Sequence, residues 1–142
     1  MTDVPDILAF QEVEVGYSKE FTVKIDSKML NDFADLSGDY NPLHMSNEYA
    51  EKTQFKKPVC HGMLLASFFS RLVGMYIPGK NSLYFSQTLN FRLPCFVNDT
   101  ISVHGKVIEK RDLTKMITIK TEIHNQDDIC VVDGIAKVIV RE

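Results

Sequence analysis

The sequence predicts an α+β fold in which a long antiparallel β-sheet wraps around a buried central α-helix. The segment from Met63 to Tyr76 would place apolar residues on nearly every side of a helix, so such a helix has to be buried. After Pro78 most of the chain alternates apolar and polar residues with a period of two, which is typical of strands with one face on a core. A curved sheet around a helix satisfies both patterns.

The first elements are a strand and an amphipathic helix. Residues 21–25 alternate as in a strand. Asp26 or Ser27 can cap the helix that follows, and Gly38 can end it in a left-handed conformation. The apolar face expected for this helix consists of Met29, Leu30, Phe33, Ala34 and Leu36.

The later elements are separated by short turns. After a turn at residues 39–42, Ser46 can cap a short helix through Tyr49 and Ala50. After the central helix we expect one long strand from Leu83 to Leu93, with a slip of phase between Phe85 and Leu89 that indicates a bulge. The same-face residues expected for the last three strands are Ile101, Val103 and Val107; Ile117, Ile119, Thr121 and Ile123; and Cys130, Val132, Ala136, Val138 and Val140.

The chain length indicates a single domain with its own hydrophobic core. The 142 residues correspond to a single domain, 1–142, at about 150 residues per domain. Such a chain buries roughly two thirds of the surface that its unfolded form exposes, so its core needs no disulfide or metal. About five strands cannot enclose a helix alone. We therefore expect a homodimer whose two sheets join edge to edge.

Composition excludes several partners. The 16 Lys and Arg against 19 Asp and Glu give a net charge of −3, and basic residues never form more than a pair, so no nucleic-acid partner is expected. No apolar run approaches the roughly 20 residues that span a bilayer, so no membrane partner is expected either. The acidic N-terminus does not resemble a signal peptide, and three widely spaced cysteines suit a cytoplasmic protein.

The densest polar cluster lies in residues 37–44. Asp39 and His44 stand five residues apart across a turn, where a carboxylate and an imidazole can converge on one small molecule such as water. General acid/base catalysis uses such a pair. The structural alternative is that Asp39 or Asn41 forms an Asx-turn and that His44 is a surface residue.

A second cluster, residues 58–62, leads directly into the apolar helix. Backbone N–H groups at a helix N-terminus lack intrahelical acceptors, and Gly62 lets a ligand oxygen approach them closely, so this point can form an oxyanion hole. The alternative is that His61 and Gly62 only start the helix. Cys60 would need a base and an orienting group to act as a nucleophile, so we expect a small buried side chain instead.

Other polar residues have structural explanations. Ser67 and Ser70 lie within the apolar helix, where a serine usually bonds back to a carbonyl of the preceding turn. The four histidines, His44, His61, His104 and His124, form no compact ligand set with the cysteines along the chain, so no metal site is expected. A Gly-x-Ser-x-Gly elbow, a glycine-rich phosphate loop and a His-Glu-x-x-His motif are absent.

The motifs resemble a known family. Residues 33–44, FADLSGDYNPLH, closely resemble the hydratase motif of the MaoC-like (R)-specific enoyl-CoA hydratases, which have the hot-dog fold. The resemblance continues through residues 58–67 to Ser70 and more loosely through residues 78–79 and 89–94. In that family a sheet wraps a long central helix and two subunits pair their sheets.

The resemblance implies a reaction and a set of roles. The reaction is the reversible hydration of a trans-2-enoyl-CoA to the (R)-3-hydroxyacyl-CoA. Asp39 and His44 would activate the water, the Gly62 N–H would hold the thioester oxygen, and Ser70 would be a polar neighbour of the pair. No cofactor is expected, because coenzyme A is part of the acyl-CoA substrate. The residues expected to bind the substrate are His61, Ser67, Lys56, Lys57 and Arg92, the last three as partners of the coenzyme A phosphates or as ordinary surface charges.

Three alternatives remain. A hot-dog dehydratase of acyl-carrier substrates or a thioesterase would generally carry an acidic residue on the central helix, and residues 63–76 contain none. A non-catalytic module that binds acyl-CoA would not need the pair of Asp39 and His44.

Overall fold

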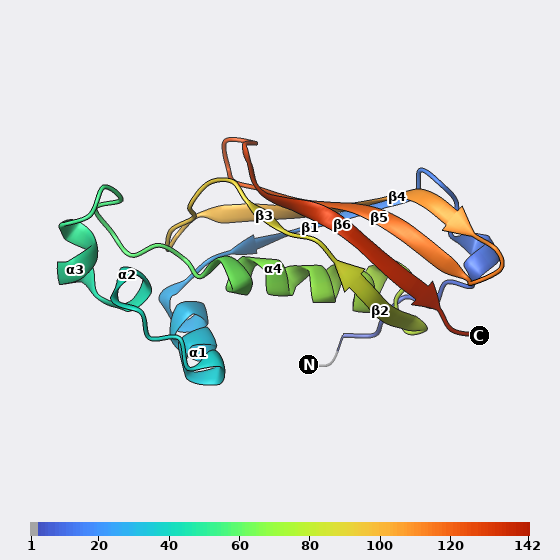
Figure 1. The fold of residues 1–142 in the computed structure, drawn as a ribbon, viewed down its shortest axis with the longest axis horizontal. Coiled ribbons are helices and arrows are strands. Elements are labelled where there is room, and N and C mark those ends of the chain that lie inside the picture. Colours follow the sequence, from blue (N-terminus) through green and yellow to red (C-terminus); the bar gives the residue numbers. More distant parts are fainter. Residues whose placement is uncertain (1–2) are drawn as a thin grey trace.

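The computed structural model describes residues 3–142 and has one curved antiparallel sheet over a central helix (Figure 1). The strands are β1 (Ser18–Lys24), β2 (Ser82–Gln87), β3 (Asn90–Phe91), β4 (Thr100–Arg111), β5 (Met116–His124) and β6 (Cys130–Val140). The sheet order is β1-β4-β5-β6-β2, and β3 also pairs with β6. The helices are η1 (Phe10–Glu12), α1 (Ser27–Ser37), α2 (Pro42–Met45), α3 (Asn47–Glu51), α4 (Gly62–Arg71) and the π-helical turn η2 (Leu72–Tyr76). The predicted α+β class is confirmed.

Both ends of α1 and the start of α3 follow the capping signals in the sequence. The Asp26 carboxylate accepts a hydrogen bond from the Met29 N–H at 2.9 Å, which makes Asp26 rather than Ser27 the N-cap of α1. Gly38 ends α1 with a φ of 80°. The Ser46 hydroxyl accepts a hydrogen bond from the Tyr49 N–H at 3.1 Å and caps α3.

The residues of the apolar face predicted for α1 differ in burial, since Leu30 and Ala34 are buried whereas Leu36 is 85% exposed. Leu36 borders an open groove of about 320 Å³ between α1 and α4. The same groove is lined by Met29 and Phe33, so the apolar stripe is continuous but its outer edge is uncovered in the single chain.

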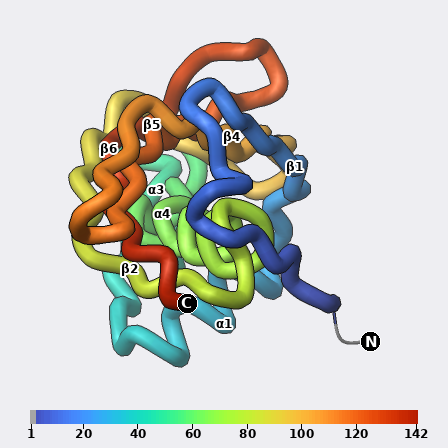
Figure 2. Tube along the Cα trace, turned by 90° about the vertical axis from the view of Figure 1, so that its right-hand side faces the viewer, coloured from blue at the N-terminus to red at the C-terminus, as the bar shows by residue number. Residues whose placement is uncertain are grey.

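Helix α4 lies against the concave face of the sheet, which curves around it (Figure 2). Its buried residues are Leu64, Leu65, Ala66 and Phe69. As expected for about five strands, the single chain does not cover this helix on all sides: Met63 is 56% exposed, and Ser67, Ser70 and Arg71 are also exposed. The sheet shields one side only. None of the helices in residues 3–142 is long and apolar enough to cross a membrane.

The long strand expected from Leu83 to Leu93 is divided into β2 and β3, both paired with β6. The pairing with β6 has a register shift between Tyr84 and Ser86, earlier than the interval from Phe85 to Leu89 that the sequence indicated, and the break between β2 and β3 lies at residues 88–89. Gly134 of β6 permits the crossing between the two pieces, since a Cβ there would lie 1.8 Å from the Thr88 carbonyl oxygen.

The face predicted for Cys130 is wrong. A second register shift at the end of β5 places His124 opposite Cys130, while Ile123 pairs with Val132. Ile123 and Val132 are buried toward the core, so Cys130 shares the outer face of the sheet with His124.

Candidate active site

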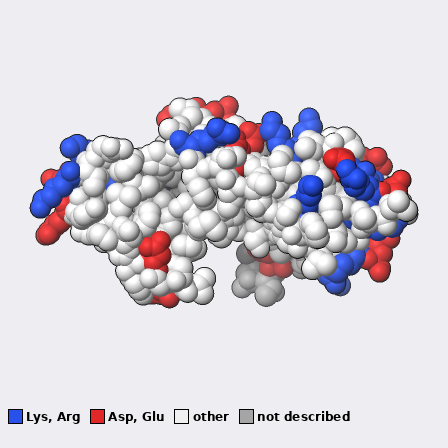
Figure 3. Space-filling model, viewed as in Figure 1, with Lys and Arg blue, Asp and Glu red and all other residues white. Residues whose placement is uncertain are grey.

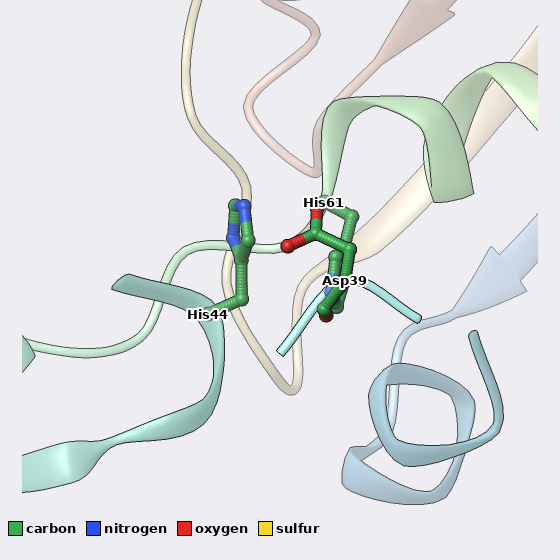
Figure 4. A group of neighbouring side chains, drawn as sticks. All are labelled: Asp39, His44 and His61. Atoms are coloured by element: carbon green, nitrogen blue, oxygen red, sulfur yellow. The ribbon is translucent and has the colours of Figure 1, made fainter. Parts of the chain in front are cut away.

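Asp39, His44 and His61 meet at the N-terminal end of α4 (Figure 4). Asp39 follows α1, His44 lies in α2 and His61 is the N-cap of α4. One ligand atom from each side chain lies within 4.8 Å of the other two. The capping and turn signals of the sequence thus bring the two predicted clusters together.

The Asp39 carboxylate is held by the turn that follows α1. Its Oδ1 accepts a hydrogen bond from the Asn41 N–H at 3.1 Å, and the Asn41 side chain in turn accepts from the Leu43 N–H at 3.0 Å. Both Asx-turns that we considered as structural alternatives are therefore present. They leave Asp39 Oδ2 without a hydrogen bond from residues 3–142, and the carboxylate points toward the His44 ring (Figure 4).

The tautomer of His44 follows from its backbone contact. Its Nδ1 lies 2.6 Å from the Val59 carbonyl oxygen, which can only accept, so Nδ1 carries the proton. The Nε2 atom then keeps its lone pair. His44 also lines a cleft of about 370 Å³, so this lone pair is available to a bound water or ligand.

His61 lies beneath this pair and is only 2% exposed. Its Nε2 donates to the Asp39 carbonyl oxygen at 3.1 Å, and its ring stacks on His44 with centroids 4.2 Å apart. Phe33 packs on it from another side, with centroids 4.9 Å apart. Its Nδ1 is buried and has no hydrogen-bond partner in residues 3–142. His61 therefore supports Asp39 and His44, although we expected it to bind substrate.

Gly62 is the first residue of α4 and lines the same cleft as His44. Its N–H donates no hydrogen bond within residues 3–142, as is usual in the first turn of a helix. A Cβ at Gly62 would lie 2.8 Å from the Phe91 ring. Glycine therefore keeps both the amide and the cleft wall in place.

Ser67 and Ser70 differ in their hydrogen bonding. Ser67 donates its hydroxyl to the Leu64 carbonyl oxygen at 2.6 Å, the back-bonding that the sequence suggested. Ser70 has no such bond in residues 3–142 and is exposed. Both line a groove of about 490 Å³ with Tyr84 and Phe33, on the open side of α4. In the single chain the structure does not place Ser70 in hydrogen-bond contact with Asp39.

Of the three basic residues expected to bind the substrate, Arg92 alone lines the cleft. It pairs through Nε with Asp133 at 2.5 Å, and this hydrogen bond lowers the pKa of the Asp133 carboxyl. The Lys57 ammonium lies 4.5 Å from the centre of the Phe96 ring. Lys56 belongs to the same loop before α4 and is exposed.

Cys60 also lines the cleft but is not suited to be a nucleophile. The side chain is 3% exposed, and burial raises the pKa of its thiol to about 12. A thiol with that pKa is protonated near neutral pH. The expectation of a small buried side chain at Cys60 agrees with these properties.

The cluster of Asp39, His44 and His61 offers too few available ligand atoms to bind a metal ion well. Of its two imidazoles, His44 has only Nε2 free, and the free Nδ1 of His61 is buried beneath the pair. The two remaining donors, His44 Nε2 and the exposed Asp39 carboxylate, fall short of the three protein ligands of a catalytic zinc. They suit a water molecule better.

Sequence reasoning missed the contacts that orient the pair. The Val59 carbonyl fixes the tautomer of His44, and Phe33 packs on His61. Neither contact has a spacing signal, because each joins segments from different parts of the chain.

The curved sheet, the central helix and the acid–imidazole pair at its N-terminus define a hot-dog protein with a hydratase-type site. Residues 9–128 match the family described as MaoC like domain. The chain belongs to this family.

The similar proteins include several that are named (R)-hydratases. The (R)-specific enoyl-CoA hydratase of Aeromonas caviae is 39% identical over 131 residues, which cover 92% of this chain and 98% of that protein. The solved (R)-hydratase structure from A. caviae superposes with a TM-score of 0.89 over the same shares of the two chains. An R-hydratase structure from Pseudomonas aeruginosa is 37% identical, with a TM-score of 0.92 over 98% of this chain and 88% of that one. A mitochondrial 3-hydroxyacyl-[acyl-carrier-protein] dehydratase of Arabidopsis thaliana is 32% identical over 90% of this chain and 78% of that protein.

Proposed function

We propose that the protein hydrates trans-2-enoyl-CoA reversibly to (R)-3-hydroxyacyl-CoA. The observation that carries the proposal is the convergence of the Asp39 and His44 side chains, with His44 lining the same mostly apolar cleft as Gly62. The (R) configuration and the coenzyme A carrier are supported by the similarity to the hydratases of Aeromonas caviae and Pseudomonas aeruginosa.

The proposed reaction adds water across the conjugated double bond. His44 Nε2 accepts a hydrogen bond from the water and orients it, and Asp39 takes its proton as the oxygen attacks C3. Negative charge then moves through C2 onto the thioester oxygen, where the Gly62 N–H stabilises it. One of the pair returns a proton to C2. The proton lost by water is thus matched by the proton gained at C2, and no electron carrier is needed.

The expected size of each contribution follows from comparable groups. A general acid or base typically accelerates a reaction about 10²- to 10⁴-fold. An oxyanion donor typically adds about 10²- to 10³-fold. No further cofactor is required by this scheme, because the reaction is redox-neutral and coenzyme A enters as part of the substrate.

For the coenzyme A phosphates we propose Arg92, Lys56 and Lys57 as partners. Arg92 lines the cleft, and its pairing with Asp133 holds the guanidinium near the cleft wall. The two lysines belong to the loop that enters α4. We propose Ser67 and Ser70, which line the adjoining groove, as contacts of the acyl part or of the pair in the assembled protein.

We further propose a homodimer formed along β2. This strand is a free edge of the sheet and exposes Leu83 and Phe85, at 52% and 64%. A broad area of the surface over α4 and this edge is largely uncharged (Figure 3). A second copy paired there would cover the open side of α4 and shield Asp39 from bulk water.

The cytoplasm is the compartment we propose. All three cysteines, Cys60, Cys95 and Cys130, are free thiols, which agrees with a reducing environment.

The test is a substrate panel with the purified protein. Crotonyl-CoA should lose its conjugated ultraviolet absorbance, and the product should be oxidised by an (R)-specific but not an (S)-specific 3-hydroxyacyl-CoA dehydrogenase. Faster turnover of the matching acyl-carrier-protein substrate would favour the dehydratase. Release of free coenzyme A thiol would indicate a thioesterase, and binding without turnover would indicate a non-catalytic module.

A further inference from the structure

A second cluster of polar side chains lies on the face of the sheet turned away from α4. Ligand atoms of Glu122, His124 and Cys130 lie within 4.8 Å of one another. His124 and Cys130 are paired across the hairpin of β5 and β6, and Glu122 lies two residues before His124 on the same face. The loop of this hairpin, residues 125–129, projects from the sheet on the side opposite α4 (Figure 1). The expectation that no histidine would join a cysteine in a compact set is therefore wrong.

His124 has the hydrogen-bond pattern of a metal ligand. Its Nδ1 lies 2.8 Å from the Asp128 carboxylate, which can only accept when ionised, so in neutral His124 the proton is on Nδ1. The Nε2 atom has no hydrogen-bond partner in residues 3–142 and is shielded from solvent. Metal-bound histidines almost always donate their other N–H to a carboxylate or carbonyl in this way.

His104 on β4 repeats the pattern. Its Nδ1 lies 3.2 Å from the Glu20 carboxylate, and its Nε2 is likewise buried without a partner in the described residues. It pairs in register with Glu122, and its ring centroid lies 4.8 Å from that of His124. The neighbouring strands β4 and β5 thus carry two imidazoles, each with a carboxylate near Nδ1 and no hydrogen bond at Nε2 within residues 3–142, and the Glu122 carboxylate lies 3.6 Å from His124 Nε2.

The loop that carries Asp128 is well supported. The Asn125 side chain accepts hydrogen bonds from the N–H groups of Asp127 and Ile129, at 2.9 and 3.1 Å. The Gln126 side chain accepts from the Thr100 N–H at 3.1 Å, which ties the loop to β4. The carboxylate that orients His124 therefore does not depend on a freely moving turn.

We propose that Glu122, His124 and Cys130 bind a divalent transition-metal ion such as Zn²⁺, with His104 as the fourth ligand. Thiolate, imidazole and carboxylate together suit zinc, whose bonds to them are about 2.0 to 2.3 Å long. Tetrahedral ligands at those lengths stand roughly 3 to 4 Å apart, so side-chain shifts of about 1 Å would bring Glu122, His124 and Cys130 onto one ion, and His104 would join them by a rearrangement of its side chain. The ion would pin the β5–β6 hairpin to β4 and would take no part in the chemistry at Asp39.

The experiment uses tag-free full-length protein stripped with a chelator and titrated with Co²⁺, followed by Zn²⁺ competition. We expect one Co²⁺ per chain with a sulfur-to-cobalt charge-transfer absorbance, displaced by Zn²⁺. Cys130→Ser should abolish that absorbance, and Zn²⁺ should raise the melting temperature of the wild type but not of Cys130→Ser. Asp128→Asn should keep the absorbance and weaken binding about 10- to 100-fold.

Two controls separate this site from others. Asp112→Asn removes the same charge in the turn between β4 and β5 and should leave the affinity unchanged. His44→Ala should also bind Co²⁺ normally, because the cluster at α4 is not involved. Absence of saturable binding, or an identical spectrum in Cys130→Ser, would overturn the proposal. None of these readouts depends on hydratase activity.

Discussion

The rings of His44 and His61 stack with their centroids 4.2 Å apart and their planes inclined by 28°. His61 also donates to the carbonyl oxygen of Asp39, so one buried ring supports both members of the proposed catalytic pair. Since His61 is the N-cap of α4, the pair is positioned directly by the central helix.

This relationship predicts different effects for two substitutions at His61. His61→Gln keeps an N–H for the Asp39 carbonyl, whereas His61→Phe keeps a ring for stacking and loses the donor. Loss of the hydrogen bond is worth about 0.5 to 1.5 kcal/mol, so we expect His61→Phe to lower kcat about 2- to 10-fold with little change in KM. His61→Gln should retain more of kcat. Equal, wild-type kcat values in both variants would show that the contact does not position Asp39.

Gly62→Ala should lower kcat/KM by displacing the Phe91 ring, which lies 2.8 Å from the position of the new Cβ. We expect a loss of about 10- to 100-fold, because Phe91 and the Gly62 amide line the same cleft. The double variant Gly62→Ala with Phe91→Ala removes the collision and should recover part of the activity. A single variant with wild-type kinetics would argue against a role for this part of the cleft.

The proposed dimer predicts that Phe85→Asp, on the exposed edge strand β2, yields a monomer. An unpaired charge at the centre of the interface would oppose association. The matched control is Leu113→Asp, since Leu113 is fully exposed in the turn between β4 and β5. Light scattering coupled to size-exclusion chromatography measures the mass. A wild-type mass for Phe85→Asp would place the interface elsewhere.

Ser70→Ala should reduce activity less than any change to the pair itself. Ser70 lies on the open side of α4 without a back-bond in residues 3–142, whereas Ser67 has one. Its hydroxyl is therefore free to contact substrate or the pair once that side is covered. Steady-state kinetics with crotonyl-CoA measure the effect, and unchanged values would leave Ser70 with no role in the reaction.

Local signals predicted much of the fold. Asp26, Gly38 and Ser46 mark helix ends through their own side chains or backbone freedom, and each occupies the expected position. The register of Cys130 could not be predicted, because a bulge that shifts one residue reverses the face of its neighbour. The open side of α4 in the single chain was expected, but apolar periodicity did not indicate which residues of the helix would face it.

The candidate site, like the fold, was predicted where local signals exist and not where distant segments meet. The sequence placed Asp39 and His44 on one turn and Gly62 at a helix start, and the structure brings these parts together. The support of His61 beneath Asp39 and the cluster of His124 with Cys130 depend on contacts between distant segments. No spacing along the chain encodes them.

The most direct test of the account is the initial rate of crotonyl-CoA hydration by the wild type, Asp39→Asn and His44→Ala. Circular dichroism and the measured mass confirm that each variant is folded and assembled like the wild type. Because each residue is assigned a role in activating the same water, we predict that each substitution lowers kcat about 10²- to 10⁴-fold. A wild type that does not hydrate the substrate, or folded variants that retain full activity, would contradict the account.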